Sequence, residues 1–166
     1  MPSARGSRAR GVRPSGTVRL AVLAVALGGV LAGCQGDPAP SATPQDPADV
    51  AAELETLTND ARADEGLPAY EHSDCAATAA VERATALVGQ AELTHADMNP
   101  VMTACDVMVA GENLSRTAEP PADVIDAWLH SSGHRANLLD AQYTAMGAGC
   151  VPDGDEVLCS LVFVAQ

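Results

Sequence analysis

The sequence predicts an α+β domain in which helices cover an antiparallel sheet. Apolar residues recur at helical spacing in several segments between residues 46 and 139. From Tyr143 to the C-terminus the pattern changes to two strand-like runs separated by a turn signal. Helices therefore come first and paired strands last, which is the order typical of α+β domains.

A targeting segment precedes this domain. Five arginines lie in the first nineteen residues, and an uninterrupted run of thirteen small and apolar residues follows from Leu20 to Ala32. This run is shorter than the ~20 residues of a membrane-spanning helix and matches the apolar region of a signal peptide. We therefore predict that residues 1–33 are a signal peptide.

The end of the apolar run, Leu31-Ala32-Gly33-Cys34, resembles the bacterial lipobox. This resemblance implies cleavage before Cys34 and lipidation of its thiol; a plain secretory signal followed by a chance cysteine is the alternative. Residues 34–47 are rich in proline and small polar residues, which predicts an extended tether. The folded domain is expected over residues 48–166, held by the Cys34 lipid at the outer face of a bacterial cytoplasmic membrane.

The charge of the chain is strongly asymmetric. Five of the nine basic residues precede Cys34, whereas all 22 acidic residues follow it. Four basic residues against 22 acidic ones give the mature chain a formal charge of −18 with neutral histidines. This charge argues against nucleic acid and anionic lipid headgroups as direct partners. We expect a monomer that meets an unknown ligand or protein of the cell envelope.

The first helix has clear boundary signals. An aspartate and a proline at 46–47 predict its N-cap and first residue. It is expected to run to about Asp64 and to be stopped by Gly66. Asn59 and Arg62 lie one turn apart near its end, where we expect a solvated face.

The middle of the chain gives weaker signals. Ser73 can cap a second helix over residues 75–90, whose many alanines imply close packing against a helix or a sheet. After Leu93-Thr94-His95 the chain loses periodicity through Ala104, which predicts a loop. The short apolar run at 107–110 is compatible with a strand or a turn.

Two helices are predicted next. A pair of prolines at 120–121 opens the third helix, whose apolar stripe is Val124, Ile125, Trp128 and Leu129. Ser131 or Ser132 can cap a fourth, short helix that reaches Leu139.

Residues 143–151 and 156–165 predict a hairpin with a four-residue loop. Such a hairpin places Cys150 opposite Cys159, and we predict a disulfide between them. With Cys34 lipidated, Cys75 pairs with Cys105 by elimination. A cysteine-ligated zinc site is disfavoured because the sequence has no CxxC motif.

The ordered motifs resemble the CAP superfamily, the cysteine-rich secretory protein, antigen 5 and pathogenesis-related group whose domain is also called SCP, in its bacterial branch. The landmarks that carry the resemblance are Asn59-Asp60-Ala61-Arg62 with Gly66-Leu67, Leu93-Thr94-His95, Gly111-Glu112-Asn113-Leu114, Trp128 with Ser131-Ser132-Gly133-His134-Arg135, and Met146-Gly147-Ala148-Gly149. They span nearly the whole domain. The resemblance implies an α-β-α sandwich.

The resemblance also implies a surface cleft, which in many members holds two histidines and two glutamates and in some binds divalent metal. His95, Glu112 and His134 match three of these positions, and the fourth carries Ser131 instead of glutamate. Two imidazoles and a carboxylate suit Zn²⁺ or a similar ion, with Glu112 as third ligand or as base for a bound water. No cofactor is established by this pattern; Zn²⁺ or another divalent metal is the candidate.

Each of these residues also has a structural interpretation. Glu112 can brace neighbouring turns through backbone amides, and His95 and His134 can be hydrogen-bonded structural groups. Asn113 and Arg135 are assigned to structure, and Trp128 to the core. His130 is a candidate replacement for the missing polar partner, whereas His72 is expected on the surface.

Three functions follow as hypotheses. The leading one is a non-catalytic binding module whose cleft takes a small ligand, a metal or an envelope component. The alternatives are a metal-dependent hydrolase of peptides or esters, and a lipid or sterol carrier. The GxSxG and HExxH hydrolase signatures are absent, and few aromatic residues are available to line an apolar groove.

Overall fold

The computed structural model describes residues 45–166. The predicted signal peptide 1–33, the lipidation site Cys34 and most of the 34–47 tether lie outside the described residues. In chain order the elements are α1 (Pro47–Asp64), β1 (Glu71–His72), α2 (Asp74–Leu87), α3 (Asn99–Cys105), β2 (Val109–Thr117), α4 (Pro121–His130), α5 (Ser132–Leu139), β3 (Ala145–Asp153) and β4 (Glu156–Ala165).

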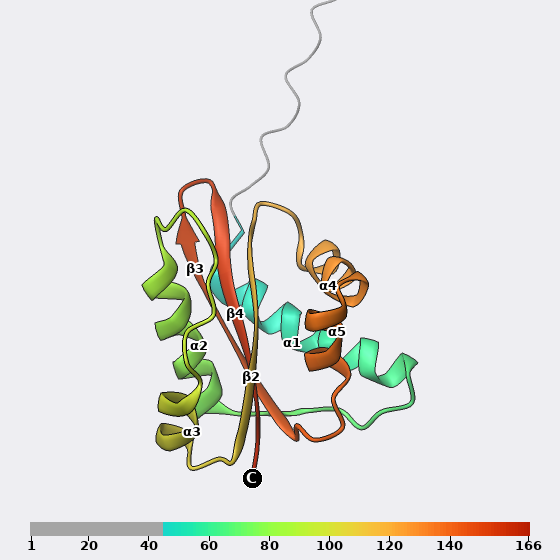
Figure 1. Ribbon diagram of the computed structural model, residues 1–166. Helices are drawn as coiled ribbons and strands as arrows, with labels where there is room; N and C mark the ends of the chain where they lie inside the picture. The colour runs from blue at the N-terminus through green and yellow to red at the C-terminus, as the bar shows by residue number, and fades with distance from the viewer. Residues whose placement is uncertain (1–44) are drawn as a thin grey trace, which may run out of the picture. The chain divides into compact units, whose positions relative to one another are not determined.

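The strands form one sheet in the order β1-β3-β4-β2 (Figure 1). β4 lies inside the sheet and pairs antiparallel with β3 and β2, whereas the two-residue β1 pairs parallel with the start of β3. Helices α2 and α3 lie on one side of the sheet, and α1, α4 and α5 lie on the other. This confirms the predicted α+β class and the α-β-α sandwich. Within residues 45–166, every helix is too short or too polar to cross a membrane.

Helix α1 follows its sequence signals. The Asp46 side chain accepts a hydrogen bond from Ala48 N at 2.9 Å, and the first helical residue is proline. The helix ends at Asp64, and Gly66 beyond it adopts a φ of +71° that suits glycine. The predicted boundaries are therefore confirmed.

The expectation that Arg62 lies on a solvated face is wrong. Arg62 is only 1% exposed. Its guanidinium donates hydrogen bonds to the carbonyls of Pro68, Leu138 and Asp140. The guanidinium also lies 3.5 Å from the ring centroid of Tyr70. Burial lowers the pKa of Arg62, but the group stays charged because carbonyl oxygens accept hydrogen bonds from its N–H groups.

Helix α2 packs directly on the sheet because two glycines of β3 leave room for its backbone. A Cβ atom built on Gly147 would lie 2.1 Å from Ala77 N, and one on Gly149 would lie 2.2 Å from Val81 N. The facing residues of α2 include Ala76 and Ala80, which are fully buried. The alanine content of α2 thus reflects close contact with a sheet rather than with another helix.

In the middle of the chain one prediction is wrong and one open alternative is decided. The segment from His95 to Ala104 is not entirely loop, because α3 begins at Asn99 and has Pro100 in its first turn. The N-cap residue Met98 makes no side-chain capping bond, but the Asp97 side chain accepts from Asn99 N at 3.0 Å. Residues 109–117 form the long strand β2, which includes Glu112, so the run at 107–110 leads into a strand rather than a turn.

The remaining predictions hold with small changes. Helices α4 and α5 form as expected, although Ser131 occupies the N-cap of α5 without a side-chain capping bond. Both disulfides are confirmed, joining Cys75 to Cys105 and Cys150 to Cys159. The hairpin turn is shorter than predicted: Asp153 pairs with Glu156, which leaves two turn residues, and Gly154 takes a φ of +66°.

We predict that Gly147→Ala destabilises the fold by about 3 kcal/mol, because the new methyl group would meet backbone atoms of α2 that cannot move independently. Gly133→Ala is the matched control, since nothing lies within 4 Å of its Cβ position. Urea unfolding of the oxidised protein measures both. Equal stability of the two variants would contradict the close approach of α2 to β3.

Candidate functional site

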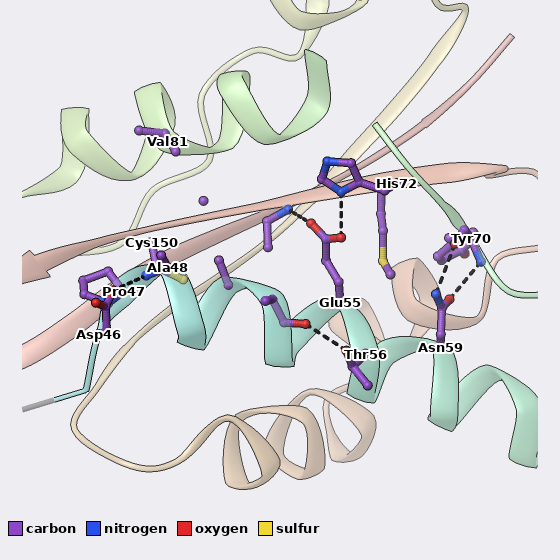
Figure 2. A pocket seen from close by; sticks show the side chains of 15 residues that line it. Asp46, Pro47, Ala48, Glu55, Thr56, Asn59, Tyr70, His72, Val81 and Cys150 are labelled. Carbon is purple, nitrogen blue, oxygen red and sulfur yellow. Dashed lines mark hydrogen bonds and ion pairs between the residues drawn. The ribbon is translucent and has the colours of Figure 1, made fainter. Parts of the chain in front are cut away.

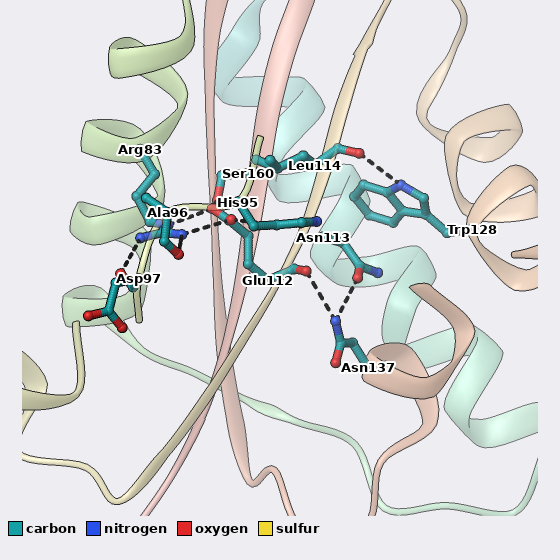
Figure 3. Close-up of polar contacts among 10 residues, drawn as sticks. All are labelled: Arg83, His95, Ala96, Asp97, Glu112, Asn113, Leu114, Trp128, Asn137 and Ser160. Atoms are coloured by element: carbon teal, nitrogen blue, oxygen red, sulfur yellow. Dashed lines mark hydrogen bonds and ion pairs between the residues drawn. The ribbon is translucent and has the colours of Figure 1, made fainter. Parts of the chain in front are cut away.

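The candidate site is built around Glu112, whose side chain comes from β2 and is 3% exposed (Figure 3). Arg83 reaches it from α2, and His95 reaches it from the segment between α2 and α3. Ser160 approaches from the neighbouring position on β4. The carboxylate therefore joins a helix, a loop and two strands.

Both oxygens of the Glu112 carboxylate are engaged. Oε1 accepts from Arg83 Nε at 2.5 Å and from Ser160 Oγ at 2.8 Å. Oε2 accepts from Arg83 Nη2 at 2.8 Å and lies 2.9 Å from His95 Nδ1. The Arg83 pair is bidentate, which is the strongest geometry for an arginine and a carboxylate.

Protonation states follow from these contacts. Burial raises the pKa of Glu112, but hydrogen bonds from Arg83, His95 and Ser160 outweigh burial and hold that pKa below its ordinary value. The hydrogen bonds to Glu112 likewise raise the pKa of Arg83. An ionised Glu112 can only accept, so Nδ1 of His95 donates to it. In neutral His95 the other ring nitrogen, Nε2, is then an acceptor.

A second set of hydrogen bonds connects α4 and α5 to β2. Asn137 Nδ2 of α5 donates to Glu112 O at 3.1 Å and to Asn113 Oδ1 at 3.0 Å. Asn113 Nδ2 in turn donates to His134 O at 3.1 Å. Trp128 Nε1 donates to Leu114 O at 3.2 Å. These contacts hold α4 and α5 against the β2 edge of the sheet.

A cavity of about 310 Å³ lies between the two sets of contacts. Its lining consists of His95, Met98, Glu112, Ser131, Gly133, His134 and Asn137. Burial, and then the proximity of His95, lower the pKa of His134, so its imidazole is neutral at pH 7. Neither His95 Nε2 nor the His134 ring has a hydrogen-bond partner among residues 45–166. The cavity therefore presents two imidazole edges to a ligand.

The side chains fit a three-ligand metal site poorly. Between residues 45 and 166, no three His, Cys, Asp or Glu side chains are arranged to hold a metal ion. Glu112 is committed to Arg83, Ser160 and His95, and Ser131 is a weak ligand. The donor set available in this cavity is thus two imidazoles, fewer than the three protein ligands of a catalytic zinc site.

The structure brings His95, Glu112, Ser131 and His134 to one cavity. His130 does not line this cavity; its side chain is 77% exposed and its Nδ1 lies 2.8 Å from Asp126 O on its own helix. The hypothesis that it replaces a missing polar partner is therefore wrong.

The structural assignments hold for the other residues named from sequence. Asn113 bonds His134 O, and the exposed Arg135 pairs with Glu65 at 2.7 Å. Trp128 is buried, and His72 is exposed as expected.

Sequence reasoning missed Arg83, Ser160 and Asn137. Arg83 had a usable signal, because only four basic residues follow Cys34 and a buried acid must find its counter-charge among them. Ser160 is a lone hydroxyl in an apolar strand, which can mark a buried polar contact. Asn137 gave no signal that distinguishes it from a solvated helix residue.

The α-β-α sandwich is the fold of solved SCP-domain structures. Residues 56–166 match the CAP family, described as the cysteine-rich secretory protein family. The match covers well over half of the chain, and the chain therefore belongs to this family.

Individual relatives are similar over limited lengths. A stretch of 45 residues, 27% of this chain, is 42% identical to 18% of the uncharacterized protein YkwD of Bacillus subtilis. An extracellular protein containing an SCP domain from Bacillus anthracis superposes with a TM-score of 0.66 and 22% identity, over 79% of this chain and 45% of that one. An outer surface protein from Borrelia burgdorferi gives a TM-score of 0.66 and 19% identity, over 74% and 96%. The chain thus spans less than half the length of the two Bacillus proteins.

We predict that Glu112→Gln lowers the free energy of unfolding at pH 7 by about 3 kcal/mol, because it leaves the Arg83 guanidinium buried without its counter-charge. Glu65→Gln is the control, since it breaks the exposed Arg135 pair and should cost under about 1 kcal/mol. Chemical unfolding measures both. Losses of equal size would contradict the central role of Glu112.

Glu112→Gln should also change how the free energy of unfolding depends on pH. The folded pKa of Glu112 lies below the unfolded value of 4.5, so its contribution is present above about pH 4.5 and is lost as pH falls through the folded pKa. Glu112→Gln should therefore lose less stability than the wild type between pH 5 and pH 2.5. An identical acid slope in both proteins would be inconsistent with a lowered pKa.

Proposed function

We propose that the protein is a non-catalytic binding module of the bacterial cell envelope, anchored by lipid on Cys34 at the outer face of the cytoplasmic membrane. Its cavity binds a small polar ligand, for which His95 and His134 supply the contact groups. The chain acts as a monomer with its ligand or partner outside the cytoplasm.

The main support for this proposal is that the Glu112 carboxylate is already fully hydrogen-bonded. Among residues 45–166 it is the only carboxylate that lines the cavity, and its two oxygens already accept from Arg83, Ser160 and His95. A general base must be free to accept a proton, yet the lowered pKa of Glu112 makes it a poor acceptor at neutral pH. Glu112 thus positions His95 rather than activating a water molecule.

A divalent metal such as Zn²⁺ is a second ligand that the cavity can take through the two imidazoles. The neutral state of His134 supports this, because imidazole binds metal only when deprotonated. With two protein ligands, the remaining metal positions would be filled by water or by an incoming ligand. The hydrolase alternative lacks a free base, and the carrier alternative lacks an apolar lining in this cavity.

The expected location has independent support. Two disulfides agree with an oxidising compartment. The two solved structures named above are described as an extracellular protein and an outer surface protein. The lipobox-like Leu31-Ala32-Gly33-Cys34 supports a lipid anchor in this compartment.

Zinc titration tests the ligand role of the histidines. We expect calorimetry at pH 7.5 to show one Zn²⁺ bound per chain in the wild type and none in the His95→Ala/His134→Ala variant. The matched control is His72→Ala/His130→Ala, which removes two exposed histidines away from the cavity and should bind as the wild type does. All three proteins should melt within about 2 °C of one another, a shift that corresponds to under about 1 kcal/mol.

The same proteins are assayed for hydrolysis of p-nitrophenyl acetate with and without zinc. Equal background rates in all three support a non-catalytic module. Zinc-dependent turnover that disappears in the His95→Ala/His134→Ala variant would overturn it in favour of the hydrolase. Equal zinc binding by that variant and the wild type would reject the two imidazoles as metal ligands.

Membrane attachment is tested by Cys34→Ser. We expect the wild type to sediment with bacterial membranes and to require detergent for release, because the acyl chains bury apolar surface in the bilayer. Cys34→Ser should move the protein to the soluble fraction or block its processing. Unchanged sedimentation of the variant would rule out the lipid anchor.

A further inference from the structure

We propose that the outer edge of β3 is a docking site for an extended peptide segment that carries lysine or arginine. This site lies beside α1 and the β1 edge of the sheet and shares no residue with the His95 cavity. It is therefore independent of the function proposed for that cavity.

The edge of β3 is only partly covered. β1 pairs with Ala145 and Met146 and then leaves the sheet, whereas β3 continues to Asp153. Ser73 N donates to Met146 O at 2.8 Å, and Ala148 N donates to Glu55 Oε1 at 2.8 Å. Even-numbered residues of β3 thus direct their backbone groups outward. From Ala148 onward, no strand within residues 45–166 pairs with this edge.

Cys150 follows the same alternation. It faces Cys159 of β4 with a Cα–Cα distance of 4.1 Å, which is typical of a non-hydrogen-bonded antiparallel pair. Its own N–H and C=O therefore point away from β4, toward the open edge. Pro152, the next outward residue, has no N–H, so the pairing stretch is short and centred on Ala148 and Cys150.

A groove of about 780 Å³ runs along this stretch (Figure 2). Ala148, Gly149 and Cys150 contribute to its lining, together with small α1 residues such as Ala48 and Ala52. Val81 of α2 borders it from the other side and is 43% exposed. Small side chains beside free backbone groups are what an added strand requires, because the backbones must approach closely.

Glu55 marks one end of the docking stretch. Its Oε1 accepts a hydrogen bond from Ala148 N, as the carbonyl of an added strand would. Its Oε2 lies 2.8 Å from His72 Nδ1. The unpaired groups of the edge are then Ala148 C=O and both backbone groups of Cys150. A peptide can donate to the first and exchange hydrogen bonds with the second.

Charge selects the occupant. Among residues 45–166, the charged and ionisable lining of the groove consists of Asp46, Glu55 and His72, with no lysine or arginine. All four arginines of the described residues are engaged elsewhere: Arg62 with carbonyls, Arg83 with Glu112, Arg116 with Asp153 and Arg135 with Glu65. His72 pairs with Glu55, but no arginine of residues 45–166 pairs with the acids of the groove, and a basic peptide complements them.

The test uses a fluorescein-labelled nine-residue peptide of alternating lysine and valine, capped at both ends, in 150 mM salt to screen non-specific attraction. Anisotropy of this probe is measured with the wild type and with Ala52→Arg, which adds bulk and positive charge to the groove wall. Ala63→Arg is the matched control, an exposed alanine of the same helix outside the groove. We expect Ala52→Arg to weaken binding at least tenfold and Ala63→Arg less than twofold, with equal melting temperatures.

Two further measurements separate strand pairing from mere charge attraction. Hydrogen exchange by NMR should slow at least tenfold at the Cys150 amide when the peptide is added. A peptide N-methylated at alternate residues should bind at least tenfold more weakly. Absence of binding, equal weakening by both arginine variants, or undiminished binding of the N-methylated peptide would each overturn the proposal. If dodecanoate slows exchange of the Cys150 amide and the peptide does not, the groove is a lipid site and the proposal is overturned.

Discussion

The buried carboxylate of Glu112 is the constraint on which the rest of this structure depends. An ionised group at this depth is tolerated only when its charge and its lone pairs are matched, and here Arg83, Ser160 and His95 provide the match. These partners come from a helix, a strand and a loop that are distant in sequence. Satisfying one carboxylate therefore fixes how α2, the loop and the sheet are assembled, and it sets the orientation of the His95 ring.

The close approach of α2 to the sheet makes this arrangement reachable. Gly147 and Gly149 let the backbone of α2 rest on β3, at separations that a Cβ would forbid. From that position Arg83 can span to Glu112 with both its Nε and Nη2 atoms. On the other side of the sheet the buried Arg62 ties the end of α1 to the end of α5 through carbonyl oxygens. The buried Arg62 and the partly buried Arg83 thus stabilise the two helical layers, Arg83 chiefly through a carboxylate and Arg62 through backbone carbonyls.

The two edges of the sheet differ in how their backbone groups are covered. On the β2 edge, Asn137 and Trp128 donate to the outward carbonyls of Glu112 and Leu114, so that α4 and α5 close the edge and leave a polar cavity beside it. On the β3 edge, β1 and Glu55 cover only the first part. Proline at 152 limits the exposed remainder, as expected where an open edge would otherwise promote aggregation. One edge therefore lies beside a polar cavity, and the other leaves a short stretch of strand without a partner strand among residues 45–166.

The sequence alone determined the features whose signals are local. The Asp46 cap and Gly66 bounded α1, prolines opened α4, and alternation with a turn signal defined the β3–β4 hairpin and its disulfide. The ordered motifs also indicated the family and located His95, Glu112, Ser131 and His134. Tertiary structure decided what depends on distant partners: that β2 is a strand rather than a turn, that Arg62 is buried, and that Arg83 and Ser160 hold Glu112. A side chain's charge and size are written in the sequence, but its burial and its hydrogen-bond partner are set by residues tens of positions away, which only the folded chain brings together.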